Sequence, residues 1–122
     1  MIYVIDDDEI MAGCIERACG ELREVKIFTN GIEAAQALDQ TGVPDLIFLD
    51  ILLDGPDGFT FLNELASYAD TAVVPVVVVS SLDLAGRDLS VYNVVGVLDK
   101  NTMLPEEIKN YVVQYDENKN DA

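Results

Sequence analysis

Short apolar runs, each followed by a polar side chain, recur along the chain and alternate with stretches of helical periodicity. Such runs stand at residues 2–5, 46–49, 76–79 and 94–98. A strand that is apolar on both faces suits a parallel sheet covered by helices, because both of its faces are then buried. The pattern therefore predicts an α/β fold whose strands are joined by crossover helices.

The segments between the runs complete the set of elements. Strands are expected at 2–5, 25–28, 45–49, 76–79 and 95–98, and helices at 9–20, 30–39, from 58, within 82–94 and from 105. The helix within 82–94 is expected to be short or frayed, since it contains several poor helix formers. The residues expected to face the core from the other four helices are Met11, Ile15, Ala18, Leu22, Ile32, Ala35, Leu38, Leu62, Leu65, Ala66, Ala69, Ile108, Tyr111, Val112 and Tyr115.

Five strand–helix units with right-handed crossovers leave few topologies. The expected one is the flavodoxin-like three-layer (βα)5 sandwich, a parallel five-stranded sheet of order 2-1-3-4-5. This order puts the strand at 2–5 beside the strand at 45–49. With 122 residues the chain is expected to form one domain over 1–116, followed by a polar tail at 117–122.

Charge and cysteine usage exclude several functional classes. The 23 acidic and 7 basic residues give a net charge of −16, so direct binding to nucleic acid or to an anionic membrane is not expected. No apolar run approaches the ~20 residues of a membrane span, and no secretion leader is visible. Cys14 and Cys19 are the only cysteines and histidine is absent, which excludes a Cys/His zinc site and favours reduced thiols in a cytoplasmic protein.

Five polar side chains are expected to meet at one edge of the sheet, where ligands collect in open α/β folds. They follow or end the strands at 2–5, 45–49, 76–79 and 95–98, and they are Asp6, Asp7, Asp50, Ser80 and Lys100. Carboxylates packed together repel by up to ~4 kcal/mol per pair at 4 Å, and a divalent cation relieves that repulsion. Magnesium suits such oxygen ligands, with Asp7 and Asp50 bound directly and Asp6 holding a coordinated water.

The same set of side chains also suits phosphoryl chemistry. An aspartate can attack phosphorus and carry the phosphoryl group as an acyl phosphate. Because that group adds negative charge beside existing anions, it needs nearby cations, which Mg²⁺ and Lys100 supply. Ser80 can then donate a hydrogen bond to a phosphoryl oxygen.

These residues, in this order and approximate spacing, resemble the receiver domain of two-component response regulators over about residues 1–115. Asp57-Gly58, Pro75 and Gly96 stand where that family has similar residues. The resemblance implies that a histidine kinase or a histidine phosphotransfer protein donates a phosphoryl group to Asp50 with Mg²⁺ bound. It further implies that the backbone carbonyl of Leu52 is a metal ligand, that Ser80 moves on phosphorylation, and that an unknown downstream protein reads the change.

The chain also departs from the family pattern. Val97 stands where an aromatic switch residue is usual, and Tyr92 is a candidate substitute from the helix expected before this strand. The lysine of the family is usually followed by a cis-bonded proline, and here Asn101 stands in that position. Because a cis bond before a non-proline residue is costly, the Lys100–Asn101 bond is expected to be trans, which would change the direction of the lysine side chain. Asp54 replaces a common proline, and the segment from Ser80 to Lys100 is about two residues short.

Leu52 and Leu82 occupy positions that tune dephosphorylation in the family. Neither can orient an attacking water, so slow self-dephosphorylation is expected.

Two alternative functions remain open from the sequence. A degenerate receiver would act as a docking module without phosphorylation. A phosphatase of the haloacid-dehalogenase type would use Asp6 as nucleophile and Asp8 as acid/base, with Ser80 and Lys100 in supporting roles, but it leaves Asp50 unexplained. The main interpretation is a phosphoacceptor domain that catalyses only its own phosphotransfer and dephosphorylation.

Overall fold

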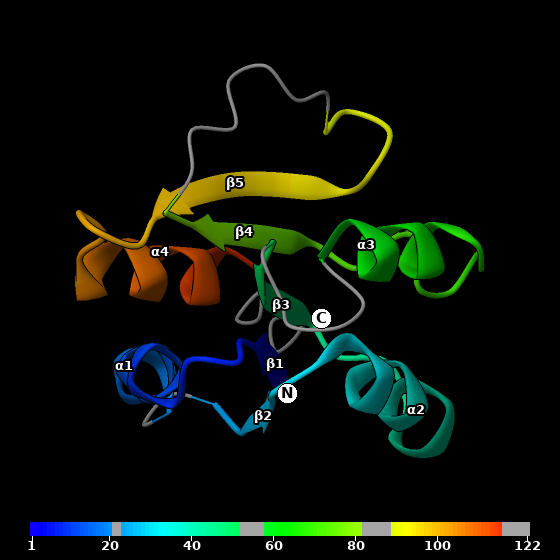
Figure 1. The fold of residues 1–122 in the computed structure, drawn as a ribbon, viewed down its shortest axis with the longest axis horizontal. Coiled ribbons are helices and arrows are strands. Elements are labelled where there is room, and N and C mark those ends of the chain that lie inside the picture. Colours follow the sequence, from blue (N-terminus) through cyan, green and yellow to red (C-terminus); the bar gives the residue numbers. More distant parts are fainter. Residues whose placement is uncertain (21–22, 52–57, 82–88, 116–122) are drawn as a thin grey trace.

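A computed structural model describes residues 1–20, 23–51, 58–81 and 89–115 (Figure 1). Its elements follow one another as β1 (Ile2–Ile5), α1 (Glu9–Cys19), β2 (Val25–Phe28), α2 (Gly31–Thr41), β3 (Leu46–Asp50), α3 (Gly58–Ala66), β4 (Val76–Ser80), β5 (Val94–Asp99) and α4 (Pro105–Tyr115). The strands form one parallel sheet of order β2-β1-β3-β4-β5. The predicted fold class and strand order are confirmed.

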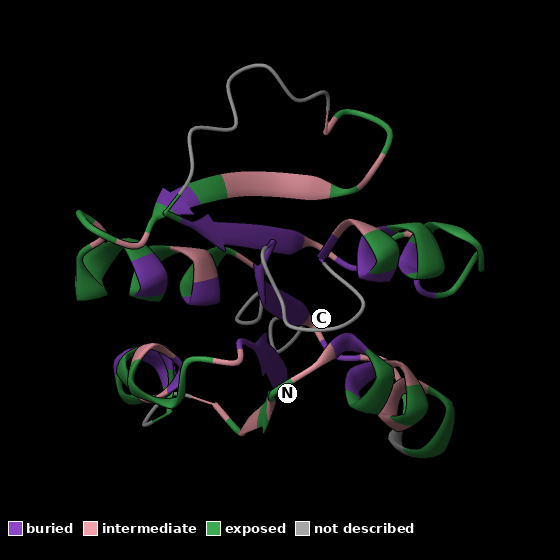
Figure 2. Ribbon diagram, in the orientation of Figure 1, coloured by how far each residue is buried: buried purple, intermediate pink, exposed green. Residues whose placement is uncertain are grey.

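Helices cover both faces of the sheet. Figure 1 shows α1 and α4 against one face and α2 and α3 against the other. Every residue of β1, β3 and β4 is buried, whereas the edge strands β2 and β5 are largely half-buried or exposed, as Figure 2 shows for β5. The unbroken apolar runs of the sequence are thus the central strands, because only these are covered on both faces.

Side chains that alternate along the central strands point to opposite faces of the sheet and pack into two separate cores. Val4, Phe48 and Val77 pack with α1 and α4, whereas Tyr3 and Ile47 pack with α2 and α3. Among the described residues the longest helices, α1, α2 and α4, have 11 residues each, which is short of the ~20 that a transmembrane helix needs.

A register irregularity shapes the edge strand β5. Val76 pairs with Val94 and Val77 with Gly96, so Val95 is an extra residue on β5. Gly96 then lies against the ring of Tyr111, where a Cβ would come within 1.9 Å of the hydroxyl oxygen. A larger residue at this position would force the Tyr111 ring to move, so glycine suits this close approach inside the strand.

The short or frayed helix predicted within 82–94 lies mostly outside the described residues, and its described end, 90–93, forms turns.

The predicted inward face of α2 is wrong at one residue. Ile32 is 53% exposed, and Ala34 is the fully buried hydrophobic side chain of this helix. Residues two apart on a helix point about 200° apart, so a helix that buries Ala34 turns Ile32 to the surface.

The third helix also differs from its prediction. Leu62 and Leu65 are buried as expected, but Ala66 and Ala69 are exposed. The helix ends at Ala66, so helical periodicity no longer applies at Ala69. Thr71 closes this end, because its hydroxyl donates a 2.6 Å hydrogen bond to the carbonyl of Leu65.

Candidate functional site

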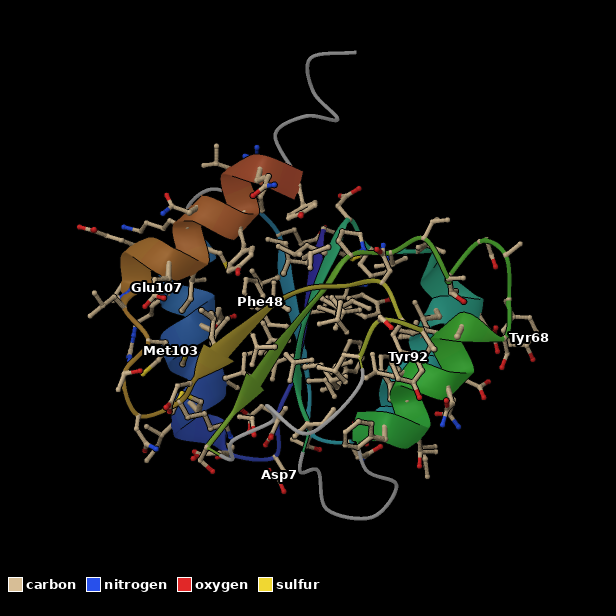
Figure 3. All side chains as sticks on the ribbon, turned by 90° about the horizontal axis from the view of Figure 1, so that it is seen from above. Asp7, Phe48, Tyr68, Tyr92, Met103 and Glu107 are labelled. Carbon is tan, nitrogen blue, oxygen red and sulfur yellow. The ribbon has the colours of Figure 1, made fainter. Side chains whose placement is uncertain are left out.

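The strand register brings the predicted acidic residues together. Ile5 pairs with Leu49, so the next residues, Asp6 and Asp50, lie side by side at the carboxyl ends of β1 and β3. Asp6, Asp7 and Asp50 each offer a carboxylate oxygen, and these oxygens lie within 4.8 Å of one another. Asp6 and Asp50 are buried, while Asp7 is more open and lies at the end of the sheet in Figure 3.

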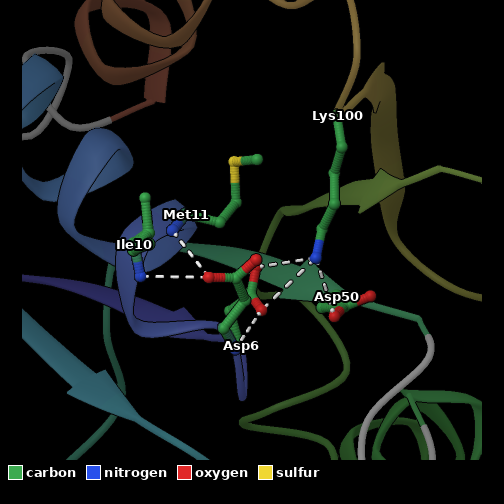
Figure 4. A network of polar contacts seen from close by, with 6 residues as sticks. Asp6, Ile10, Met11, Asp50 and Lys100 are labelled. Atoms are coloured by element: carbon green, nitrogen blue, oxygen red, sulfur yellow. Dashed lines mark hydrogen bonds and ion pairs between the residues drawn. The ribbon is translucent and has the colours of Figure 1, made fainter.

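Lys100 reaches this acidic cluster from the end of β5. Its Nζ lies 3.0 Å from Asp50 Oδ2 and 3.1 Å from Asp6 Oδ2 (Figure 4). The Lys100 backbone N–H also donates to the carbonyl of Ser80 at 3.0 Å, which continues the pairing of β4 and β5. No peptide bond in the described residues is cis, so the Lys100–Asn101 bond is trans. Lys100 therefore contacts Asp6 and Asp50 although Asn101, and not the usual proline, follows it.

Burial and charge act together on the ionisation of this cluster. Burial raises the pKa of the Asp6 carboxyl to about 6, and the charge of Asp50 adds to the effect. The backbone N–H of Asp8 and the Lys100 ammonium oppose this shift. Burial lowers the pKa of Lys100, but its hydrogen bonds to Asp50 and Asp6 outweigh burial and leave that pKa raised. The ammonium therefore stays charged beside the two carboxylates.

The donor set fits a hard divalent cation. Three carboxylates within one small volume are oxygen ligands of the kind that Mg²⁺ prefers. Asp6 Oδ2 is buried and accepts no hydrogen bond of acceptable geometry, although Lys100 Nζ is 3.1 Å away. An anionic oxygen in that position lacks part of its solvation, which a cation or a cation-bound water would restore.

Asp8 serves as the cap of α1. Its Oδ1 accepts hydrogen bonds from the backbone N–H groups of Ile10 at 3.0 Å and Met11 at 3.2 Å (Figure 4). Its own N–H donates to Asp6 Oδ1 at 2.9 Å, which holds the Asp6 carboxylate in place. The Asp8 carboxylate is thus engaged as a helix N-cap, which explains both of its hydrogen bonds, and this gives no support to the acid/base role of a dehalogenase-type phosphatase.

Ser80 and Val97 lie on the paired strands β4 and β5, and β5 runs into Lys100. Ser80 ends β4, is 2% exposed and follows Val79, the register partner of Asp50. Val97 is 49% exposed on β5. Tyr92 lies on the turn before β5 and not on a helix, and its hydroxyl donates to Asn63 Oδ1 of α3 at 2.7 Å. The tyrosine is therefore tied to α3.

Leu52, Asp54, Asp57 and Leu82 lie outside the described residues, so the sequence predictions for them stay predictions.

Gly58 is a site residue whose packing role the sequence reasoning missed. A Cβ on Gly58 would lie 2.6 Å from Ile51 Cα and 2.8 Å from the carbonyl oxygen of Asp50. The Gly58 N–H also donates to the Ile51 carbonyl at 3.0 Å. The first residue of α3 therefore presses on the backbone that carries Asp50. The sequence signal was a glycine at a helix start, which alone does not reveal what lies against it.

Known proteins resemble this chain over most of its length. The family model described as "Response regulator receiver domain" matches residues 2–112. The response regulator PleD of Caulobacter vibrioides is 35% identical over 86 residues, which are 70% of this chain and 19% of PleD. The chain thus spans about a fifth of that curated relative.

Two solved structures share the fold. The receiver domain of NtrX from Brucella abortus has a TM-score of 0.81 at 22% identity, covering 94% of this chain and 97% of that one. The receiver domain of the sensor histidine kinase PA1611 from Pseudomonas aeruginosa, solved with magnesium coordinated in its active-site cleft, has a TM-score of 0.79 at 19% identity, covering 93% of this chain and 94% of that one. With the family model matching nearly the whole sequence, the chain belongs to the response regulator receiver domains of two-component signalling.

Proposed function

We propose that Asp50 is the phosphoacceptor of this receiver domain. The observation that carries the proposal is the position of Lys100 Nζ, 3.0 Å from Asp50 Oδ2 in an acidic cluster whose Asp6 and Asp50 are buried. A fixed ammonium beside a carboxylate stabilises the extra negative charge that a phosphoryl group brings. Asp6 is assigned to metal binding instead, because its Oδ1 already accepts the backbone N–H of Asp8 and its buried Oδ2 is the oxygen left for a cation.

The transfer step is a substitution at phosphorus. An Asp50 carboxylate oxygen forms a bond to the phosphorus of a phosphohistidine while the phosphorus–nitrogen bond breaks. The electron pair of the broken bond stays on the histidine ring, which takes up a proton. Lys100 holds the acyl phosphate oxygens by charge, and Ser80, at the neighbouring strand end, supplies a hydroxyl donor for the same group.

Asp6, Asp7 and Asp50 are the described residues that would hold Mg²⁺, and the Leu52 carbonyl is a further predicted ligand. The bound cation supplies positive charge against the phosphoryl oxygens during transfer. The magnesium coordinated in the PA1611 receiver domain supports this assignment by analogy of fold.

Partners and context follow from the family. The phosphodonor is a histidine kinase or a histidine phosphotransfer protein, and the output is a protein–protein contact with a downstream target. We place the domain at residues 1–116 in the cytoplasm, with no activity beyond its own phosphotransfer and dephosphorylation. Ser80 and Lys100 bind the phosphoryl group, Val97 replaces the usual aromatic switch, and Leu52 and Leu82 slow dephosphorylation.

One labelling experiment tests the acceptor. The protein is incubated with Mg²⁺ and acetyl phosphate, the acyl phosphate is trapped with borohydride, and the modified residue is located by mass spectrometry. The expected label is on Asp50 and is absent from Asp50→Asn. A label on Asp6, or no label in a folded protein, would overturn the assignment. An acyl phosphate half-life of seconds would contradict the slow-dephosphorylation proposal alone.

A further inference from the structure

Two adjoining hollows lie between α2 and α3, away from the acidic site. One, of about 140 Å³, is lined by Gly31, Ile32, Ala35, Thr60, Phe61 and Glu64. The other, of about 240 Å³, adds Leu38, Asp39 and Tyr68. Because Ile32, Ala35 and Glu64 line both, the hollows form one continuous surface feature, the α2–α3 groove.

Two large side chains that line the groove, Ile32 and Tyr68, are exposed to solvent. Ile32 is 53% exposed, and Tyr68, which Figure 3 shows at the outer edge of the molecule beyond α3, is 58% exposed. Ile32 lies nearly opposite Ala34 on α2, so it points away from the core that Ala34 joins. Neighbouring exposed apolar side chains on one face are typical of a surface that binds another protein.

The charge around the groove has one sign. The sequence holds no lysine or arginine between Lys26 and Arg87, although that stretch contains nine aspartates and glutamates. On and just after α2 and α3, the exposed acids are Glu33, Asp39, Glu64 and Asp70. The helices on the opposite face also carry acids, Glu9, Glu16, Glu106 and Glu107, but these are accompanied by Arg17 and Lys109. The α2–α3 side therefore differs in having no lysine or arginine to offset its acidic side chains.

We propose that the α2–α3 groove docks a basic amphipathic segment of another protein. An aliphatic or aromatic side chain of that segment enters the hollow beside Ile32, and its lysine or arginine side chains pair with Asp39 and Glu64. The two hollows, of about 140 and 240 Å³, are each large enough to take one side chain of the partner. A second copy of the chain fits poorly, because its matching acidic rim would repel this one. The proposal does not depend on phosphoryl transfer to Asp50.

Two synthetic peptides of equal length and charge test the groove. One is an amphipathic helix of leucine and lysine, and the other carries serine in place of leucine. Each is titrated into ¹⁵N-labelled protein at 150 mM salt, and amide shift changes are mapped. The expected result is that the leucine peptide binds more tightly and shifts the amides of α2 and α3. Equal binding of both peptides, shifts centred elsewhere, or no binding would overturn the proposal.

Surface variants sharpen the test. Ile32→Ser and Glu64→Lys are each expected to weaken binding of the leucine peptide about tenfold, which corresponds to about 1.4 kcal/mol. Val113→Ser is the matched control, because Val113 is a 48% exposed aliphatic residue of α4 on the other face of the sheet. Equal loss in Val113→Ser would contradict the groove, as would amide shifts in α2 and α3 that depend on protein concentration without peptide, since these assign the groove to a second copy.

Discussion

The Cα of Gly58 lies against the end of β3, so that a Cβ on it would be 2.8 Å from the carbonyl oxygen of Asp50. The contact joins the start of α3 to the backbone of the proposed phosphoacceptor. Because the atoms in the way are backbone, they cannot rotate aside as a flexible side chain would. The position of Asp50 therefore depends on a residue that carries no side chain.

Gly58→Ala is expected to destabilise the fold by ~1–3 kcal/mol, the usual cost of overpacking a well-packed site, and to lower phosphoryl uptake by Asp50. Gly13→Ala is the matched control. Gly13 lies inside α1, and a Cβ there meets nothing within 4 Å. Alanine should therefore stabilise that helix by ~0.5–1 kcal/mol. Urea unfolding of both variants checks the contrast, and equal effects of the two substitutions would contradict it.

The pKa of Asp6 is expected to move in opposite directions in two variants. Asp50→Asn removes a neighbouring negative charge, so the pKa of Asp6 should fall below about 6. Lys100→Met removes a hydrogen bond and a positive charge, so that pKa should rise. Titration of the Asp6 carboxyl by ¹³C NMR in metal-free buffer measures both shifts. A wild-type pKa near 3.8, or shifts of the same sign, would be the contrary result.

Stability should depend on pH through Asp6. Its folded-state pKa of about 6 lies above the ordinary 3.8, so between pH 4 and 6 the folded chain holds a proton that the unfolded chain releases. The free energy of unfolding contributed by Asp6 therefore falls as pH rises through this window. At about 1.4 kcal/mol per pKa unit, the loss is at most ~3 kcal/mol.

Asp6→Asn isolates that contribution from the other carboxylates. Urea unfolding in EDTA at pH 4, 5, 6 and 7 should show the stability difference, wild type minus Asp6→Asn, declining across the window. A difference that is flat or that rises with pH would show that burial does not raise the pKa of Asp6.

Magnesium should stabilise the chain more at pH 7 than at pH 5. At ten times its dissociation constant, a ligand of the folded state adds ~1.4 kcal/mol. Below pH 6 the proton on Asp6 competes with the cation, so the gain shrinks. Thermal melting with MgCl₂ and with EDTA measures both gains, and Asp7→Asn should reduce the gain at pH 7. An undiminished Mg²⁺ effect in Asp7→Asn would remove Asp7 from the proposed ligands.

The hydrogen bond from Tyr92 to Asn63 should couple the turn before β5 to α3. A double-mutant cycle with Tyr92→Phe and Asn63→Ala is expected to give a coupling free energy of ~0.5–1 kcal/mol, the usual net value of one such bond. Urea unfolding of the two single variants and the double variant measures it. Strictly additive effects would show that the bond contributes nothing to stability.

Several features of this protein were predictable before any coordinates. The unbroken runs Ile2–Ile5 and Val76–Val79 identified buried strands, and parallel strands must leave their carboxyl ends at one edge. Placing Asp6 beside Asp50 needed only the strand order that short right-handed crossovers favour. These conclusions need only residue type and spacing along the chain, and both can be read directly from the sequence.

Other features depend on which face of an element meets its neighbour. Apolar spacing put Ile32 in the core, but α2 rests on the sheet through Ala34 and leaves Ile32 outside. Without the usual proline after Lys100, the sequence did not reveal the direction of the lysine side chain. In the structure the Lys100–Asn101 bond is trans and the ammonium contacts Asp50. The closeness of Gly58 to Asp50 likewise has no signal in the sequence.

The α/β class, the strand order and the acidic residues at the strand ends could be read from residue type and spacing alone. The rotation of α2, the reach of Lys100 and the burial that raises the pKa of Asp6 became visible only in the folded chain. This division arises because periodicity records which residues alternate along one element. The contacts, burial and charge at a given atom are set by elements distant in sequence, and these come together only on folding.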